Sequence, residues 1–87
     1  MKIDPDRLNH ASPAAVASCA AAIADVLQDR PEEVRVLGVA AFTKLFFERL
    51  GLPAQDAMTA AGNLMAAAEQ RGVKGFSGLR DYLSADF

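Results

Sequence analysis

The residues of this chain best suited to nucleophilic catalysis are few and far apart. His10 is the only histidine and Cys19 the only cysteine, and a predicted break in structure separates them. A cysteine nucleophile needs a histidine in hydrogen-bond contact and usually a third group that orients it. Cys19 also falls among apolar residues, which predicts a small core side chain. We therefore expect no catalytic residues and no enzymatic activity.

Ligands for metals and phosphates do not form a recognisable pattern either. Zinc sites use several Cys and His ligands at short spacings, and this chain has two such residues in total. Asp4 and Asp6 are too few for a calcium loop, whose ligands spread over about twelve residues. The glycine-containing segment 72–78 lacks the preceding strand of a phosphate-binding loop, so we expect a flexible turn, with a binding loop as the alternative. No metal and no cofactor are expected.

Composition and charge narrow the class of protein further. The 87 residues are 52% hydrophobic and 23% charged, which is typical of one small globular domain spanning 1–87. The net charge of −2 provides no basic field that would attract nucleic acid or anionic lipid. The single cysteine fits a reducing cytosol. The polar first ten residues are unlike a signal peptide, and the apolar run 34–47 is too short to cross a bilayer. We expect a cytoplasmic protein with no membrane contact.

Prolines and glycines divide the sequence into helices. Alanine-rich segments between them predict an N-terminal turn within 1–11 and then helices over about 13–29, 31–50, 53–71 and 78–85. Ser12 ahead of Pro13 is a good N-cap, and Asp29 or Arg30 is the expected cap of the next helix. Gly51 and Gly72 are the expected C-terminal stops. The expected fold is all-α, as a bundle or a helix-turn-helix-like arrangement of about four helices.

Two of these helices carry one narrow apolar stripe each. In the segment 13–29 the stripe is Val16, Cys19 or Ala20, Ile23, and Val26 with Leu27. In the segment 53–71 the stripe is Met58, Ala61, Met65 and Ala68. The steps of three and four residues place each set on one helix face, which we expect to be buried in the core.

The helix 31–50 is different because it is apolar on nearly every side. Only three polar residues, Arg35, Thr43 and Lys44, interrupt the run 34–47. A helix of this kind must be covered all round. The commoner explanation is a central helix wrapped by the other three. The alternative is that one face remains for a second chain. Its expected anchors are Phe42, Phe46 and Phe47, with Arg35, Lys44 and Arg49 around them.

Gly38 interrupts this helix with a residue that disfavours helix by about 0.5–1 kcal/mol relative to alanine. It is either a tolerated imperfection or a place where another helix backbone comes close. A strand at 34–40 is a minor alternative, since a lone strand would have no partner.

The segment 46–64 resembles the bacterial helix-turn-helix pattern. Gly51 would be the turn glycine, Leu52 the buried turn residue, and 53–63 the recognition helix. The resemblance implies DNA binding through Gln55, Thr59 and Asn63.

Two features of the segment depart from the helix-turn-helix pattern. Phe47 occupies a position that is usually small, and no Lys or Arg lies between Arg49 and Arg71. Because phosphate neutralisation supplies most DNA affinity, nucleic acid is not the partner we expect. DNA binding is kept as the alternative function.

The function expected from the sequence is therefore protein binding without catalysis. A small bacterial or phage-borne regulator or inhibitor, acting through an apolar helix face, fits this composition. A homodimer and a larger heterologous protein are both open as partners. A second candidate surface is formed by the C-terminal residues Phe76, Leu79, Tyr82, Leu83 and Phe87, although we favour packing of that helix on the core.

Overall fold

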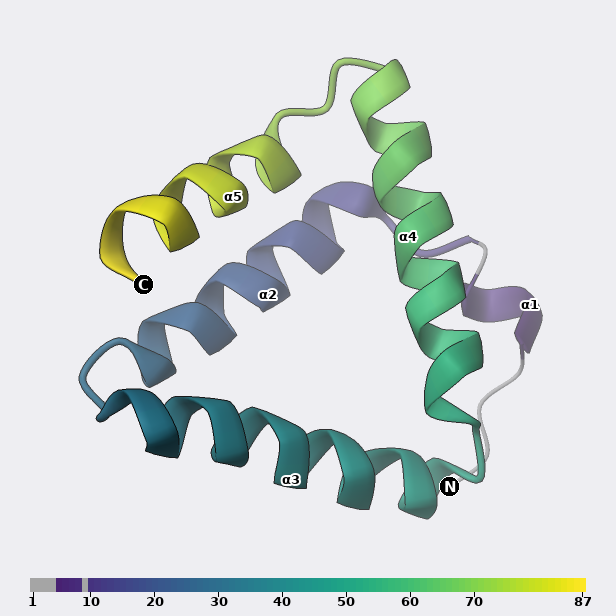
Figure 1. Cartoon of the computed structure of the whole chain (residues 1–87). Helices are drawn as coiled ribbons and strands as arrows, with labels where there is room; N and C mark the ends of the chain where they lie inside the picture. The colour runs from purple at the N-terminus through teal and green to yellow at the C-terminus, as the bar shows by residue number, and fades with distance from the viewer. Residues whose placement is uncertain (1–4, 9) are drawn as a thin grey trace.

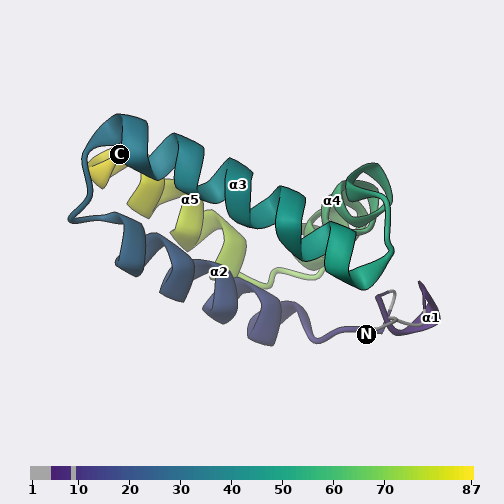
Figure 2. The ribbon, with the colours of Figure 1, turned by 90° about the horizontal axis from the view of Figure 1, so that it is seen from below.

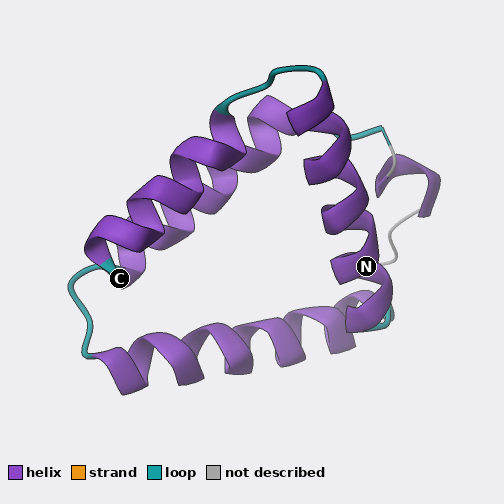
Figure 3. Cartoon of the chain, turned by 45° about the horizontal axis from the view of Figure 1, so that its top comes forward, coloured by secondary structure: helices purple, strands orange, loops and turns teal. Residues whose placement is uncertain are grey.

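The computed structural model describes residues 5–8 and 10–87, and helices joined by short turns make up the regular secondary structure of these residues (Figures 1 and 3). The elements are α1 (Pro5–Leu8), α2 (Pro13–Leu27), α3 (Glu32–Leu50), α4 (Ala54–Gln70) and α5 (Gly75–Asp86). The expected all-α class is confirmed. The N-terminal turn expected within 1–11 is represented by α1, while Asp4 lies outside the described residues.

The caps at the helix starts agree in part with the sequence patterns. Ser12 caps α2 as expected, and its hydroxyl accepts a hydrogen bond of 3.3 Å from the backbone N–H of Ala15. Pro31 and Pro53 are themselves the N-cap residues of α3 and α4, without a side-chain hydrogen bond. The assignment of Asp29 or Arg30 as the cap of α3 is therefore wrong. The proline already satisfies the steric needs of a helix start, and its carbonyl accepts the first helical hydrogen bond.

Both expected C-terminal stops are glycines in the left-handed conformation. Gly51 has a φ of 67° and Gly72 a φ of 76°. After α4 the Gly72 N–H donates to the Glu69 carbonyl (3.1 Å), and the Val73 N–H donates to the Ala68 carbonyl (2.9 Å). This pair of bonds is the Schellman motif, which satisfies carbonyls that a helix end leaves free.

The last helix begins three residues earlier than expected. Residues 75–78 form the first turn of α5, so the flexible turn expected across 72–78 ends at Lys74. The Gly78 N–H donates to the Lys74 carbonyl at 3.0 Å. The physical reason is Phe76, which is only 3% exposed, because its burial fixes this turn against the rest of the fold.

The helices are arranged as a flat triangle. α2 and α5 lie side by side along one edge, while α3 and α4 form the other two edges (Figures 1 and 3). Figure 2 shows the arrangement from below, with α3 in front of α5. The principal extents of the molecule are 36 × 33 × 17 Å. A shape this flat leaves a large share of every helix exposed.

The hydrophobic core lies where α2, α4 and α5 meet. Its buried members are Ala17, Ala68 and Phe76, and partly buried residues pack around them: Val16, Leu64, Met65 and Val73. α5 approaches α2 very closely here. A Cβ placed on Gly75 would lie 2.8 Å from the Cβ of Ala17. The core is therefore built on small side chains that allow two backbones to come close.

The stripe expected to bury α2 packs only in part, because Val16 lies against the core while most of the stripe further along the helix does not. Ala17 and Ala24 are the buried residues of α2, and they lie on its alanine side. Cys19 is exposed rather than in the core, and Ile23 and Val26 are exposed as well. The reason is that the close contact with α5 at Gly75 requires a small residue on α2, whereas Ile23 and Leu27 line a hollow beside this contact.

The central position expected for the helix 31–50 is not what the structure shows. Leu50 is the one buried residue of α3, and it lies at the corner with α4. The remaining length of α3 forms an open edge of the triangle (Figure 1). Because α2 and α5 pack on each other, neither covers the length of α3.

Tyr82 links α5 to α2 at the end opposite to the core. Its hydroxyl donates a hydrogen bond of 2.6 Å to Oδ1 of Asp25 and lies 3.1 Å from Oε1 of Gln28. The hydrogen bond to the Asp25 carboxylate raises the pKa of Tyr82 to about 12, since ionising the phenol would place two negative charges together. An exposed ion pair between Arg80 and Glu69 links α5 to α4.

We predict that Gly75→Ala lowers the free energy of unfolding by about 1–3 kcal/mol, which is the usual cost of overpacking. The new methyl group would clash with Ala17, whose Cβ cannot rotate away. Gly78→Ala is the matched control, because a Cβ on this residue of the same helix meets nothing within 4 Å. Urea unfolding followed by circular dichroism measures both variants. Equal stability of Gly75→Ala and the native chain would contradict the close approach.

We also predict that the phenol of the folded chain titrates near pH 12. The folded pKa lies above the ordinary value of 10.0, so the Tyr82–Asp25 bond stabilises the fold below about pH 10, and its contribution is lost as the pH rises through 12. Tyr82 is the only tyrosine, so ultraviolet absorbance reports on it alone. Asp25→Asn should move the midpoint toward 10, and Asp56→Asn on α4 should not. A native midpoint at 10 would rule out the bond.

Candidate protein-binding surface

The phenylalanines of α3 form a partly exposed aromatic row. Phe42 is 63% exposed and Phe46 is 40% exposed, and their rings stack with centroids 5.2 Å apart. Phe46 also contacts Phe47, with centroids 5.6 Å apart and a tilted geometry. Residues four apart on a helix are neighbours, which is why Phe42 and Phe46 meet. The row supplies a rigid apolar surface whose exposure is what the partner-binding prediction requires. The partner itself remains a prediction.

This row forms one wall of a hollow that we call the α2–α3 cleft. The cleft has a volume of about 390 Å³. Its lining is apolar except for Thr43, and consists of Ile23, Val26, Leu27, Gly38, Val39, Phe42, Thr43, Phe46 and Phe47. The cleft exists because α2 turns its larger apolar residues toward α3 when its alanine side packs on α5.

The contribution of α2 to this cleft was missed by reasoning from the sequence. Ile23 and Val26 were assigned to the core, yet Val26 is 68% exposed. The signal that could have identified them is the second apolar side of α2. Ala17 and Ala24 are seven residues apart and therefore mark a face of their own, separate from the face of Ile23 and Val26.

A second hollow, which we call the α5 groove, continues from the cleft toward the C-terminus. Its volume is about 520 Å³, and its lining includes Ala20, Ile23, Ala24, Leu27, Arg35, Val36, Val39, Leu79, Leu83 and Phe87. Three residues, Ile23, Leu27 and Val39, line both hollows. The exposed apolar surface therefore extends without a break from α3 across α2 to the end of α5.

The C-terminal residues divide between core and surface. Phe76 is buried in the core, so the favoured packing of this helix is confirmed for its first turn. Leu79 and Tyr82 are half-buried, whereas Leu83 and Phe87 are exposed at the α5 groove. The second candidate surface named from the sequence is thus partly core and partly exposed.

Arg35 is held by contacts within the chain. Its Nε donates to the Arg30 carbonyl (2.7 Å) and its Nη2 donates to the Gln28 carbonyl (2.6 Å). The guanidinium also lies 4.8 Å from the centroid of the Phe87 ring. Arg35 therefore donates hydrogen bonds to two carbonyls in the turn between α2 and α3, and these bonds fix the angle at which α3 leaves α2.

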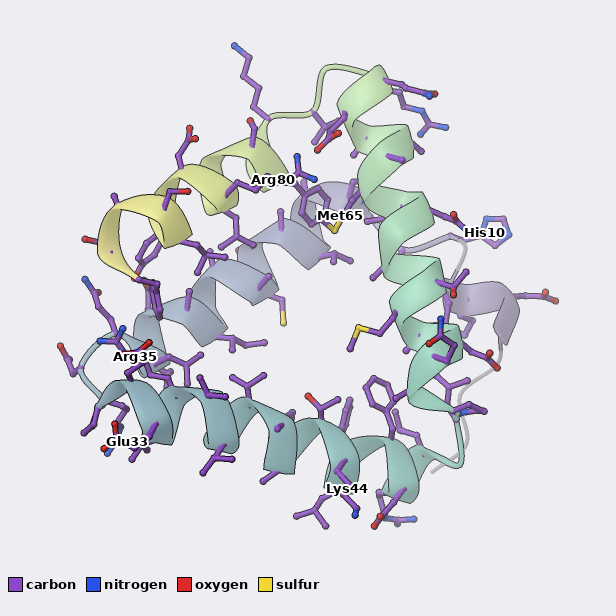
Figure 4. The ribbon with its side chains drawn as sticks, viewed as in Figure 1. His10, Glu33, Arg35, Lys44, Met65 and Arg80 are labelled. Carbon is purple, nitrogen blue, oxygen red and sulfur yellow. The ribbon has the colours of Figure 1, made fainter. Side chains whose placement is uncertain are left out.

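Lys44 and Arg49 lie apart from Arg35. Nine residues separate Lys44 from Arg35, which corresponds to about 14 Å along a helix. Figure 4 shows Arg35 pointing toward α2 and α5, whereas Lys44 projects away from the triangle. Arg49 is exposed near the corner with α4. The three cations do not form a single ring around the phenylalanines.

The total exposed surface is large for a chain of this mass. A folded monomer of 9.2 kDa exposes about 4,900 Å². This chain exposes 6441 Å², an excess of about 1,500 Å². The exposed large apolar residues are Ile23, Val26, Val34, Val36, Leu37, Val39, Phe42, Leu45, Phe46, Met58, Leu83 and Phe87. Contiguous exposed apolar residues of this kind mark interaction sites in folded proteins.

The residues of the alternative DNA-binding reading lie on α4. Gln55, Thr59 and Asn63 are exposed and follow one another at intervals of four residues, so they share a face. Asn63 also lines a hollow of about 470 Å³ together with Leu8 and His10. In Figure 1, α1 lies beside α4. The N-terminal segment therefore borders the end of the face that would have to meet DNA bases.

The candidate chemical residues remain dispersed in the fold. Cys19 is on α2 and His10 precedes that helix, and both are exposed. Among residues 5–8 and 10–87, no three His, Cys, Asp or Glu side chains gather closely enough to hold a metal ion. In the same part of the chain, no helix has the length and apolar character needed to cross a bilayer.

Comparison with known proteins adds no relative to this picture. No family model, no curated protein and no solved structure gives a significant match to the chain. The functional argument therefore depends on the geometry of the apolar surface described above.

Proposed function

We propose that this chain is a non-catalytic protein-interaction domain whose α2–α3 cleft binds an apolar helix of a larger protein. The observation that carries the proposal is the stacked, exposed pair Phe42 and Phe46 facing Ile23 and Val26. Aromatic side chains dominate the energetics of protein interfaces because they bury much area with few rotatable bonds. A regulator or inhibitor of a larger protein would use such a cleft.

The chemistry of the cleft favours a helix over a small molecule. Small-molecule sites combine apolar walls with a few polar groups that fix the orientation of the ligand. In this cleft Thr43 is the one side chain with a polar group. Two helices that border an elongated apolar hollow are the usual arrangement for binding a third, whose anchors recur every three to four residues. The partner segment should therefore present a stripe of Leu, Ile or Met.

The position of α3 along an open edge of the triangle supports the same proposal. The backbone of α3 is already a helix, with Arg35 contacts near its start and the left-handed Gly51 at its end. A preformed surface loses little conformational entropy on binding. The surface can thus dock a partner helix without rearranging its backbone.

We predict that Phe42→Ala and Phe46→Ala each weaken partner binding by about 10- to 100-fold, as expected for hot-spot residues. Phe42→Ala should lower the thermal midpoint little, because Phe42 is 63% exposed, whereas Phe46→Ala should lower it more, because Phe46 is 40% exposed and contacts two other rings. The partner is identified by capture from the native host and mass spectrometry. It is then purified and titrated against each variant by calorimetry.

The matched control is Met58→Ala, which removes an exposed apolar side chain on α4 that does not line the cleft. This variant should bind as the native chain does. A partner whose affinity is equal for the native chain, Phe42→Ala and Phe46→Ala would show that the cleft is not the binding site.

A further inference from the structure

We infer that a second copy of this chain pairs with the outer face of α3, antiparallel and about a two-fold axis. This face is defined by Val34, Leu37, Gly38, Ala41 and Leu45. This pairing is independent of the proposed function, because apart from Gly38 the residues of the outer face do not line the α2–α3 cleft. The observations that carry it are exposure, a symmetric residue pattern, charge and area.

The outer face is apolar, and the residues that the structure describes leave it exposed. Leu37 is 68% exposed, and Val34 and Leu45 are also among the exposed large apolar residues. A Cβ on Gly38 would meet nothing within 4 Å, so its lack of a side chain has no explanation in the packing of this chain. A glycine beside Ala41 does allow a neighbouring helix backbone to approach closely.

The pattern of this face reads the same in both directions. Val34, Gly38, Ala41 and Leu45 are separated by steps of four, three and four residues. An antiparallel copy centred between Gly38 and Ala41 therefore places Val34 opposite Leu45 of the second copy. Gly38 then lies opposite Ala41 of the second copy. Such self-complementarity is what a two-fold interface requires.

Charge selects the antiparallel orientation. Figure 4 shows Glu33 and Lys44 projecting on the side of α3 that faces away from the triangle. Neither forms an ion pair with the rest of the described chain. Antiparallel pairing brings Glu33 of each copy near Lys44 of the other, twice by symmetry. Parallel pairing would instead align Glu32 and Glu33 with the same carboxylates and would align the two helix dipoles.

The exposed area is sufficient for this interface in addition to the cleft. A standard stable interface buries about 800 Å² on each partner. The excess of about 1,500 Å² over a folded monomer of this mass corresponds to roughly two such faces. The outer face of α3 and the cleft are two separate exposed apolar surfaces of the molecule.

The test is sedimentation equilibrium of the full chain from micromolar to millimolar concentration. The native chain should show about twice the 9.2 kDa chain mass. Glu33→Lys and Lys44→Glu alone should each raise the dimer dissociation constant about tenfold, because each reversal opposes two like-charge pairs. The double variant Glu33→Lys with Lys44→Glu should restore native affinity. Ala41→Glu, at the centre of the face, should leave monomers.

Circular dichroism checks that every variant keeps its helices. A monomer at all concentrations would overturn the inference. A dimer whose dissociation constant is unchanged by the charge reversals and by Ala41→Glu would also overturn it. Ile23→Ala separates this inference from the proposed function, since it alters the cleft and should leave the dimer intact. A dimer that dissociates on Ile23→Ala but not on Ala41→Glu would place the contact in the cleft and refute the α3 pairing.

Discussion

Helices α2 and α5 approach so closely at Gly75 that a Cβ there would lie 2.8 Å from the Cβ of Ala17. Only glycine and alanine allow such a distance between two helix backbones, and both helices provide them at this point. The contact brings Phe76 into the core beside Ala68. It also fixes how α2 is rotated about its axis, because the alanine side of α2 must face α5.

The rotation of α2 decides the remaining surfaces of the molecule. Once Ala17 and Ala24 face α5, the larger residues Ile23 and Val26 must face α3 or solvent. α3 is then held at its ends, by Arg35 at the turn from α2 and by Leu50 at the corner with α4. Along its length, the described residues leave α3 largely exposed. The exposed apolar surface of this protein thus results from the close packing of α2 on α5.

Helix α3 consequently has two apolar sides with different properties. The side toward α2 is aromatic and hollow, and it suits the helix of a different protein. The outer side is aliphatic, contains Gly38 and Ala41, and carries opposite charges toward its two ends. We propose that the first side serves a heterologous partner and the second side a second copy. In this arrangement, a helix that is hydrophobic all round is covered on its two sides by two different partner chains.

The local pattern of the sequence was sufficient to predict the helices, because caps, prolines and glycines act within a few residues. Ser12 caps the start of α2, and Gly51 and Gly72 end α3 and α4 in the left-handed conformation. The apolar character of 34–47 was also evident from the sequence, whereas the exposure of Phe42 and Phe46 was only the alternative to a wrapped central helix. The start of α5 was placed too late because burial of Phe76, a contact distant in sequence, extends that helix.

What only the tertiary structure decided is which side of each helix is buried. Periodicity identifies apolar faces, but α2 has two of them, the alanine side and the side of Ile23 and Val26. Hydrophobicity alone favoured the larger residues, whereas the close contact at Gly75 required the smaller ones. Because the alanine side of α2 is buried, Cys19 is exposed and α3 lies at an edge of the fold rather than at its centre. The sequence by itself determined an apolar helix that needs covering. The packing of α2 on α5 determined that helices α2, α4 and α5 leave most of it exposed.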